Sequence, residues 1–335
     1  MNNLTKNQLA ALLLITDLFM LFCFCGSITI WSALGYAVGI TAQLLLALPL
    51  VLFADRGGKT EKWAEFFYLI YLVLWGGFIL NRLWNVCDEI FIPLETSGGI
   101  KGRLIITGFI SLVCLYISST GMKAVSRSAV ITAFIGVLFL LADFISAVVR
   151  CDFSGIDFSA DKSGFADGFM LCFSMGGAMG TGAVLAPLVS ESCKKGALRY
   201  FTAKLILSCT ILTTAMLVTG RIMSVTDFPV ITSVQLSQPI TNQRIDSVFM
   251  IIFAVFAVFS VTTQVMTGAY LFGRLFSGFT KGRNAVMVIM TIVSAFAVSV
   301  IPPYSAVTVT AVLVGEFAVP LILLIKAPHK MEKKK

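Results

Sequence analysis

The stretch Ser174-Met-Gly-Gly-Ala-Met-Gly-Thr-Gly182 decides how this chain folds, because it places four glycines within seven residues of an apolar run. The run extends from about 168 to 189, and a membrane-spanning helix needs about 20 residues. Each glycine destabilises an ordinary helix by about 1 kcal/mol, so a continuous helix is not expected here. Two explanations are open. Small residues allow membrane helices to pack closely, or the helix breaks and its freed backbone groups line a cavity near the middle of the membrane.

The rest of the chain has the composition of a membrane bundle. Of its 335 residues, 58% are hydrophobic and 13% are charged, whereas soluble domains carry about 25% charged residues. The runs are too long for an outer-membrane barrel, whose segments have about 10 residues of alternating polarity. We therefore predict an all-α integral membrane protein with ten spans, near 9–28, 36–54, 64–85, 103–119, 129–149, 168–189, 201–220, 247–273, 285–301 and 304–325.

These spans predict a single domain over residues 1–335, built from two inverted five-helix repeats. The first repeat covers about 9–149, the second covers about 168–325, and a short basic tail follows at 326–335. Of the 25 basic residues, 18 fall on one side of the spans, Lys204 among them, and seven fall on the other. The positive-inside rule then places both termini in the cytoplasm. The net charge of +8 follows from this bias, so we expect a lipid bilayer around the chain and no nucleic-acid partner.

In an inverted repeat the first span corresponds to the sixth, and the first span carries a carboxylate at mid-depth. Asp17 lies in the run Ile15-Thr-Asp-Leu-Phe-Met20, and a carboxylate there costs about 2.5 to 3.5 kcal/mol on insertion scales. Either Thr16 or another helix satisfies it structurally, or Asp17 lies beside a break and faces an amine or a cation. The candidate ligand-binding residues are Thr16, Asp17, Phe19, Ser174, Gly176, Gly177, Gly180 and Thr181.

Other polar residues have competing explanations. Asp143 and Glu316 are intramembrane carboxylates that serve as ion relays or pocket acids, or that bond to a serine or threonine of another helix. Arg82 either extends to the membrane interface or contributes to gating or to ligand contact. Pairing of Cys87 with Cys151 is open. The single histidine, His329, lies in the tail, and the cysteine spacing does not resemble a metal site. We therefore expect no enzyme, no cofactor and no metal.

One polar segment between the seventh and eighth spans carries a family resemblance. It reads Asp227-Phe-Pro-Val-Ile-Thr-Ser-Val-Gln-Leu-Ser-Gln-Pro-Ile-Thr-Asn-Gln-Arg-Ile-Asp-Ser-Val-Phe249. It resembles the external loop of the spore germination permease family, in which an aromatic-proline pair, here Phe228-Pro229, leads into a short helix. A charged triplet, here Arg244-Ile-Asp246, then opens the eighth span. The likeness runs from about Gln8 to Lys326, with supporting segments at 58–60, 92–96 and 121–127.

Members of that family are the B subunits of nutrient germinant receptors, and they are similar to the amino acid, polyamine and organocation transporters. The resemblance implies the LeuT-like fold with broken first and sixth helices, and a small nutrient such as an amino acid bound between these helices. The family usually has a glycine in the first break, where Asp17-Leu-Phe19 stands here. The implied lid or gating residues are Arg82, Pro229, Arg244 and Asp246.

By the same resemblance the protein would lie in the spore inner membrane with an A-type membrane subunit and a C-type lipoprotein, and would trigger germination. Two alternatives remain open. A secondary transporter of amino acids or polyamines would use the same scaffold. A channel or scaffold component would need no ligand of its own.

Overall fold

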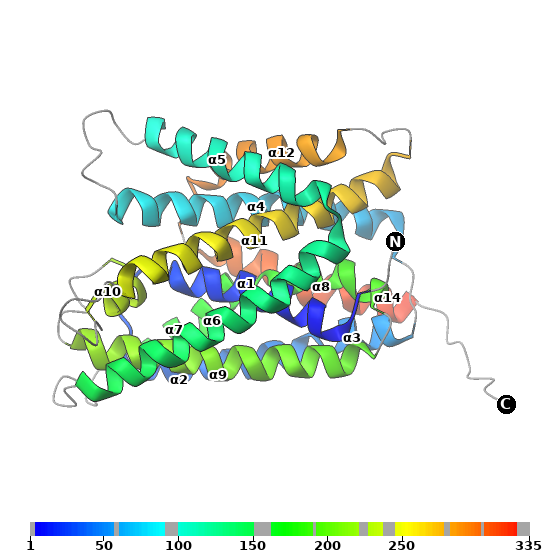
Figure 1. Ribbon diagram of the computed structural model, residues 1–335. Helices are drawn as coiled ribbons and strands as arrows, with labels where there is room; N and C mark the ends of the chain where they lie inside the picture. Colours follow the sequence, from blue (N-terminus) through cyan, green and yellow to red (C-terminus); the bar gives the residue numbers. More distant parts are fainter. Residues whose placement is uncertain are drawn as a thin grey trace.

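The computed structural model describes residues 4–56, 60–90, 100–150, 162–189, 192–220, 227–236, 245–277, 282–302 and 305–326. Within these ranges the chain is almost entirely helical, and its long helices lie side by side in one bundle (Figure 1). Eight helical segments of this part are long and apolar enough to cross a membrane. The structure is therefore that of an all-α membrane protein, as predicted.

The helices account for all ten predicted spans. Three of the spans consist of more than one helical piece, and a short helix, α10, precedes α11. In chain order the elements are α1 (Lys6–Phe22), α2 (Ile30–Leu46), α3 (Leu48–Asp55), α4 (Lys62–Ile90), α5 (Ile100–Ser119), α6 (Met122–Arg150), α7 (Gly164–Met175), α8 (Ala178–Leu185), the 3₁₀ turn η3 (Ala186–Leu188), α9 (Cys193–Thr219), α10 (Pro229–Leu236), α11 (Ile245–Leu275), α12 (Arg283–Val298), α13 (Ala306–Leu313), the π-helical turn η5 (Val314–Ala318) and α14 (Val319–Lys326).

The first span departs from its prediction. We expected helix to about residue 28 with a break beside Asp17, but α1 runs unbroken from Lys6 to Phe22. The sequence provides the reason, because no glycine or proline occurs before Gly26, whose positive φ of 132° suits a residue without a side chain. The first helix therefore ends after Phe22, and Asp17 lies within regular helix.

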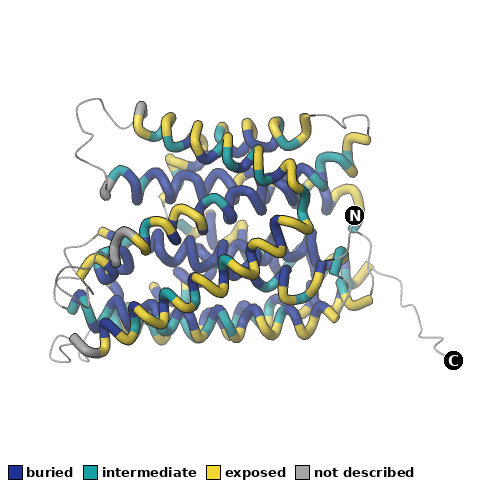
Figure 2. Tube along the Cα trace, in the orientation of Figure 1, coloured by how far each residue is buried: buried dark blue, intermediate teal, exposed yellow. Residues whose placement is uncertain are grey.

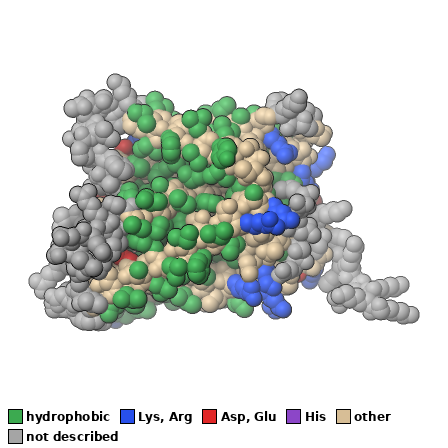
Figure 3. Space-filling view, viewed as in Figure 1, with side chains coloured by type: hydrophobic (Ala, Val, Ile, Leu, Met, Phe, Trp, Pro, Cys, Tyr) green, Lys and Arg blue, Asp and Glu red, His purple; other side chains and the backbone are tan. Residues whose placement is uncertain are grey.

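Burial separates an inner set of helices from an outer set. α1, α8 and most of α4 are buried, whereas α5 and α6 expose much of their surface (Figure 2). The exposed side chains of α5 and α6 are large and apolar, including Ile105, Phe109 and Phe134. A wide apolar surface of this kind indicates contact with lipid. Figure 3 shows apolar side chains across the middle of one face, with Lys and Arg side chains gathered toward the end of the bundle at which α1 begins and α14 lies in Figure 1.

Two contacts fix the position of the sixth span. α7 packs closely along α2, and a Cβ added at Gly168 would lie 1.9 Å from the Ser32 carbonyl oxygen. At the other end the Leu4 amide donates to the Leu188 carbonyl at 3.0 Å, which joins the start of the first span to the end of the sixth. These contacts bring the break in the sixth span beside the middle of α1.

Candidate functional site

The glycine run breaks the sixth span, as one of the two explanations predicted. α7 ends at Met175, α8 begins at Ala178, and Gly176 and Gly177 lie between them. The other explanation holds as well, because these glycines admit large neighbours. A Cβ at Gly176 would lie 2.2 Å from Nε2 of Gln43, and one at Gly180 would lie 2.1 Å from the ring of Tyr71. The run therefore makes the break and also allows close packing around it.

Two tyrosines of α4 support the irregular backbone of two other spans. The hydroxyl of Tyr71 donates to the carbonyl oxygen of Gly177, at the break, and the hydroxyl of Tyr68 donates to that of Gly315, in the π-helical turn η5; both distances are 2.9 Å. Residues three apart share one helix face. One face of α4 therefore holds the break in the sixth span beside η5 in the tenth.

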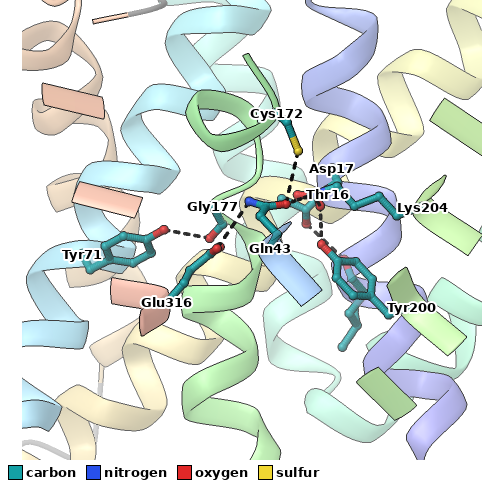
Figure 4. Close-up of polar contacts among 10 residues, drawn as sticks. Thr16, Asp17, Gln43, Tyr71, Cys172, Gly177, Tyr200, Lys204 and Glu316 are labelled. Carbon is teal, nitrogen blue, oxygen red and sulfur yellow. Dashed lines mark hydrogen bonds and ion pairs between the residues drawn. The ribbon is translucent and has the colours of Figure 1, made fainter. Parts of the chain in front are cut away.

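The carboxylate of Asp17 forms a buried ion pair. Nζ of Lys204, from α9, lies 2.6 Å from Oδ2 of Asp17, and these side chains are 1% and 3% exposed. The hydroxyl of Tyr200, one turn earlier on α9, donates to the same oxygen (Figure 4). A helix other than α1 thus provides the partners of one carboxylate oxygen of Asp17, Oδ2. Lys204 was expected with the basic residues on one side of the spans, and that expectation is wrong, because its side chain is buried inside the bundle.

Gln43 of α2 links this ion pair to Glu316. Its Oε1 accepts a hydrogen bond from Nζ of Lys204 at 2.8 Å and a weaker one from the thiol of Cys172 at 3.5 Å. Its Nε2 lies 3.4 Å from Oε2 of Glu316, a long donor contact. In Figure 4 the side chains of Gln43, Glu316, Asp17 and Lys204 converge beside Gly177. We call Asp17, Gln43, Tyr200, Lys204 and Glu316 the polar cluster.

Two carboxylate oxygens of the polar cluster have no hydrogen-bond donor within the described part of the chain. They are Oδ1 of Asp17 and Oε1 of Glu316. Buried polar atoms without a partner are rare in native proteins and call for an explanation. Carboxylate oxygens accept hydrogen bonds from ammonium groups, amides and hydroxyls. Acceptors without a donor at a broken helix thus mark a place where a ligand donor would be stabilised.

The structure places the other predicted ligand-binding residues in different roles. Thr16 donates to Leu12 and Ser174 donates to Leu171, so each hydroxyl bonds to its own helix. Phe19 packs against the ring of a phenylalanine on α11, with 5.1 Å between centroids. Thr181 donates to Gln264, also on α11, at 2.8 Å. Of this set, only Asp17 contributes a side chain to the polar cluster.

The predicted lid residues are only partly described. Arg82 is buried, with its guanidinium 4.7 Å from the ring centre of Phe78, so it does not extend to the interface. Pro229 begins α10 and is buried against the neighbouring helices. Arg244 and the side chain of Asp246 lie outside the described residues. The implied part of these two residues in a lid therefore stays a prediction.

The structure also bears on Asp143, on the two cysteines at 87 and 151, and on metal binding. Asp143 is buried in α6. Cys87 is a free thiol, and Cys151 lies outside the described residues. Within the described ranges no three histidine, cysteine or acidic side chains are grouped so that they could hold a metal ion.

A small apolar cavity adjoins the polar cluster on the side of the chain termini. It has a volume of about 30 Å³ and lies among α1, α3, α8 and α9. Tyr200 and Met179 line it together with Leu13 and Gly182. This volume is close to that of one water molecule in the liquid. The five residues of the polar cluster are themselves at most 4% exposed, so the cluster is closed to solvent.

Comparison with solved structures identifies the architecture. The chain superimposes on Mhp1, described as a nucleobase-cation-symport-1 family transporter, in a closed conformation with bromovinylhydantoin bound. The TM-score is 0.58 at 15% identity, over 93% of this chain and 75% of Mhp1. The protein has the LeuT-like transporter fold. An inward-facing form of Mhp1 matches with a TM-score of 0.56 at 14% identity, over 93% and 74% of the two chains.

This likeness covers the architecture and not the chemistry of the site, because the identity is low. No protein-family model matches the sequence, and no curated protein matches it either. The solved structures therefore show the fold of the chain and not its family. Its ligand has to be inferred from its own residues.

Proposed function

We propose that the protein is a secondary transporter that binds a small amine-bearing solute at the polar cluster and carries it across the membrane. The observation that carries this proposal is the pair of buried carboxylate oxygens without donors, Oδ1 of Asp17 and Oε1 of Glu316, beside the break in the sixth span. An ammonium group supplies three donors and a positive charge. Amino acids and small cationic amines both carry this group.

The cluster also limits how such a solute binds. A broken helix offers amide donors that attract a carboxylate, so the start of α8 would be the place for the carboxylate of a zwitterion, with Asp17 or unwound carbonyls for its ammonium. However, the Met179 amide, in the first turn of α8, already bonds to the carboxylate of Glu316. Oδ2 of Asp17 is likewise occupied by Lys204 and Tyr200. The remaining acceptors favour the amine end of the ligand.

The position of the cluster fits transport. Secondary transporters of this architecture bind substrate near the membrane midplane, at broken helices, and the polar cluster lies beside such a break. On the side of the basic end, the cavity lined by Tyr200 and Met179 adjoins the cluster. Opening of this cavity would release a solute toward that side, which the positive-inside rule assigns to the cytoplasm.

Uptake into proteoliposomes tests the proposal. The purified chain would be reconstituted alone, and entry of labelled alanine, a zwitterion, and of labelled ethanolamine, a monovalent cation, would be measured. We expect saturable uptake of at least one solute, and loss of that uptake in Asp17→Asn. A matched control is Lys326→Met, which changes a lysine that is 55% exposed at the end of α14. Uptake no faster than in empty liposomes would contradict transport.

A second candidate function is the receptor role implied by the sequence resemblance. The observation that favours it is α10, because a short helix begins at Phe228-Pro229 as that resemblance implies. In this role the same site binds a nutrient in the spore inner membrane, and the ligand shifts the bundle toward one arrangement that the A-type and C-type subunits sense.

Deletion of the gene separates the two roles. Loss of nutrient-triggered germination without any uptake defect would favour the receptor, whereas an uptake defect with normal germination would favour the transporter. If neither alanine nor ethanolamine changes the thermal stability of the purified chain, a component without its own ligand becomes the better explanation.

A further inference from the structure

The environment of Glu316 in η5 suggests a coupling device within the proposed transport site. The side chain is 4% exposed and lies in a π-helical turn, a feature that is frequent at functional sites. Its Oε2 faces Nε2 of Gln43 at 3.4 Å, and its Oε1 has no donor within the described part of the chain. Besides Gln43, the Met179 amide of α8 interacts with this carboxylate. A charged carboxylate with so few donors is still costly in a buried place.

The groups that face Glu316 leave one negative charge in excess. Asp17 and Lys204 interact with it electrostatically, and they form an ion pair with each other. The hydroxyls of Tyr68 and Tyr71, from α4, are used by two backbone carbonyls. With Asp17, Lys204 and Glu316 all ionised, the cluster carries one uncompensated negative charge.

Other elements packed against η5 do not supply the missing positive charge. α8 and α13 contain no charged residue. In α3, the only charged residue is Asp55, whose Oδ1 accepts from the Cys193 amide. In α14, the charged residue is Lys326, which is 55% exposed, and its Nζ lies 3.7 Å from Oε2 of Glu61. Since the described residues offer no further positive charge beside η5, the balancing charge has to come from a proton on Glu316 or from a cation that enters the cluster.

We propose that Glu316 holds a proton while the site is empty, and that a monovalent cationic amine displaces this proton to water when it enters the polar cluster. This inference rests on the proposed function. The O–H bond of the carboxylic acid breaks, the proton passes to water, and the carboxylate pairs with the incoming ammonium. The charge of the cluster is the same before and after, so one proton is exchanged for one amine.

The exchange predicts a difference between two kinds of solute. Ethanolamine brings one positive charge and competes with the proton, so its apparent affinity should weaken about tenfold for each unit by which the pH is lowered, as linkage requires for one exchanged proton. Alanine is a zwitterion without net charge, so its binding should not release a proton. Glu316→Gln keeps the shape of the side chain and removes the titration, so ethanolamine binding to this variant should not depend on pH.

Two readouts test the exchange. Infrared spectroscopy of the purified protein near neutral pH should show a carboxylic-acid carbonyl band that Glu316→Gln removes and that saturating ethanolamine abolishes. Glu61→Gln changes an exposed carboxylate and should leave the band in place. In weakly buffered solution, a pH-indicator dye should report about one proton released for each ethanolamine bound.

The possible results separate this inference from the proposed function. If ethanolamine binds without proton release, or if wild-type protein lacks the band, the exchange is overturned while the solute site stands. If neither ethanolamine nor alanine binds, the proposed function fails and the exchange fails with it. A band that Glu316→Gln removes, together with proton release on ethanolamine binding, supports the exchange.

Discussion

Replacement of Lys204 by methionine should strongly destabilise the protein. Nζ lies 2.6 Å from Oδ2 of Asp17, with both side chains almost fully buried. At an effective dielectric constant of about 20, two charges at this separation attract by about 6 kcal/mol. Burial of the two ions costs several kcal/mol for each, so the intact pair adds little net stability. Removal of one partner leaves the other charge buried and uncompensated, which costs about 3 to 5 kcal/mol.

The double variant gives a sharper result than the single one. Asp17→Asn combined with Lys204→Met removes both charges and keeps an amide that can accept from Tyr200. We expect the double variant to lose less stability than the two single variants lose together, with a coupling energy of about 2 to 3 kcal/mol, at the upper end for residues in contact. Unfolding in detergent micelles, followed by tryptophan fluorescence, measures all four free energies.

A matched ion pair at the surface serves as the control. Nζ of Lys326 lies 3.7 Å from Oε2 of Glu61, and these side chains are 55% and 44% exposed. Because exposed ion pairs contribute little, Lys326→Met should change the free energy of unfolding by at most about 1 kcal/mol. The reasoning is refuted if Lys204→Met costs no more than this control, or if the effects of the two single substitutions in the buried pair simply add.

Three further predictions concern packing, the break and orientation. Gly168→Ala should lower stability by about 1 to 3 kcal/mol, because its Cβ would meet the backbone of α2; Gly108→Ala, with open space around the site, should stabilise α5 by up to about 1 kcal/mol in the same thermal melts. Tyr71→Phe should lower the free energy of unfolding by about 1 to 3 kcal/mol, because it leaves the buried carbonyl of Gly177 at the break without its donor. An unchanged unfolding midpoint would show that the Tyr71 hydroxyl does not stabilise the break. In a background without native cysteines, an impermeant maleimide added to intact cells should label Lys162→Cys and should label Lys123→Cys only after permeabilisation; the opposite pattern would reverse the predicted orientation.

The sequence was sufficient for the architecture because its signals are local. Long apolar runs located the spans, and the glycines at 176 and 177 marked the break in the sixth span. The break expected beside Asp17 was wrong, because no glycine or proline interrupts the helix there. The end of α1 follows its own glycine, Gly26.

The polar cluster was harder to predict because its five members come from four separate segments of the chain. Asp17 was recognised from its depth in the first span, and Glu316 was noted without a partner. Lys204 was missed, since a lysine near the start of a span fits the positive-inside pattern equally well. Its position, four residues after Tyr200 on α9, offered one signal, because both side chains then share a helix face. Gln43 gave no signal in its sequence context.

Equilibrium binding to the purified chain in lipid nanodiscs tests the central claim most directly. Labelled alanine and labelled ethanolamine would be titrated against the wild type, Asp17→Asn and Lys326→Met, with circular dichroism to check that each is folded. We predict saturable binding of at least one solute to the wild type and to Lys326→Met. The Asp17→Asn variant should bind about tenfold more weakly or worse, as expected for loss of a hydrogen bond to a charged group. Absence of saturable binding to the wild type, or equal affinity in the folded Asp17→Asn variant, would contradict the account.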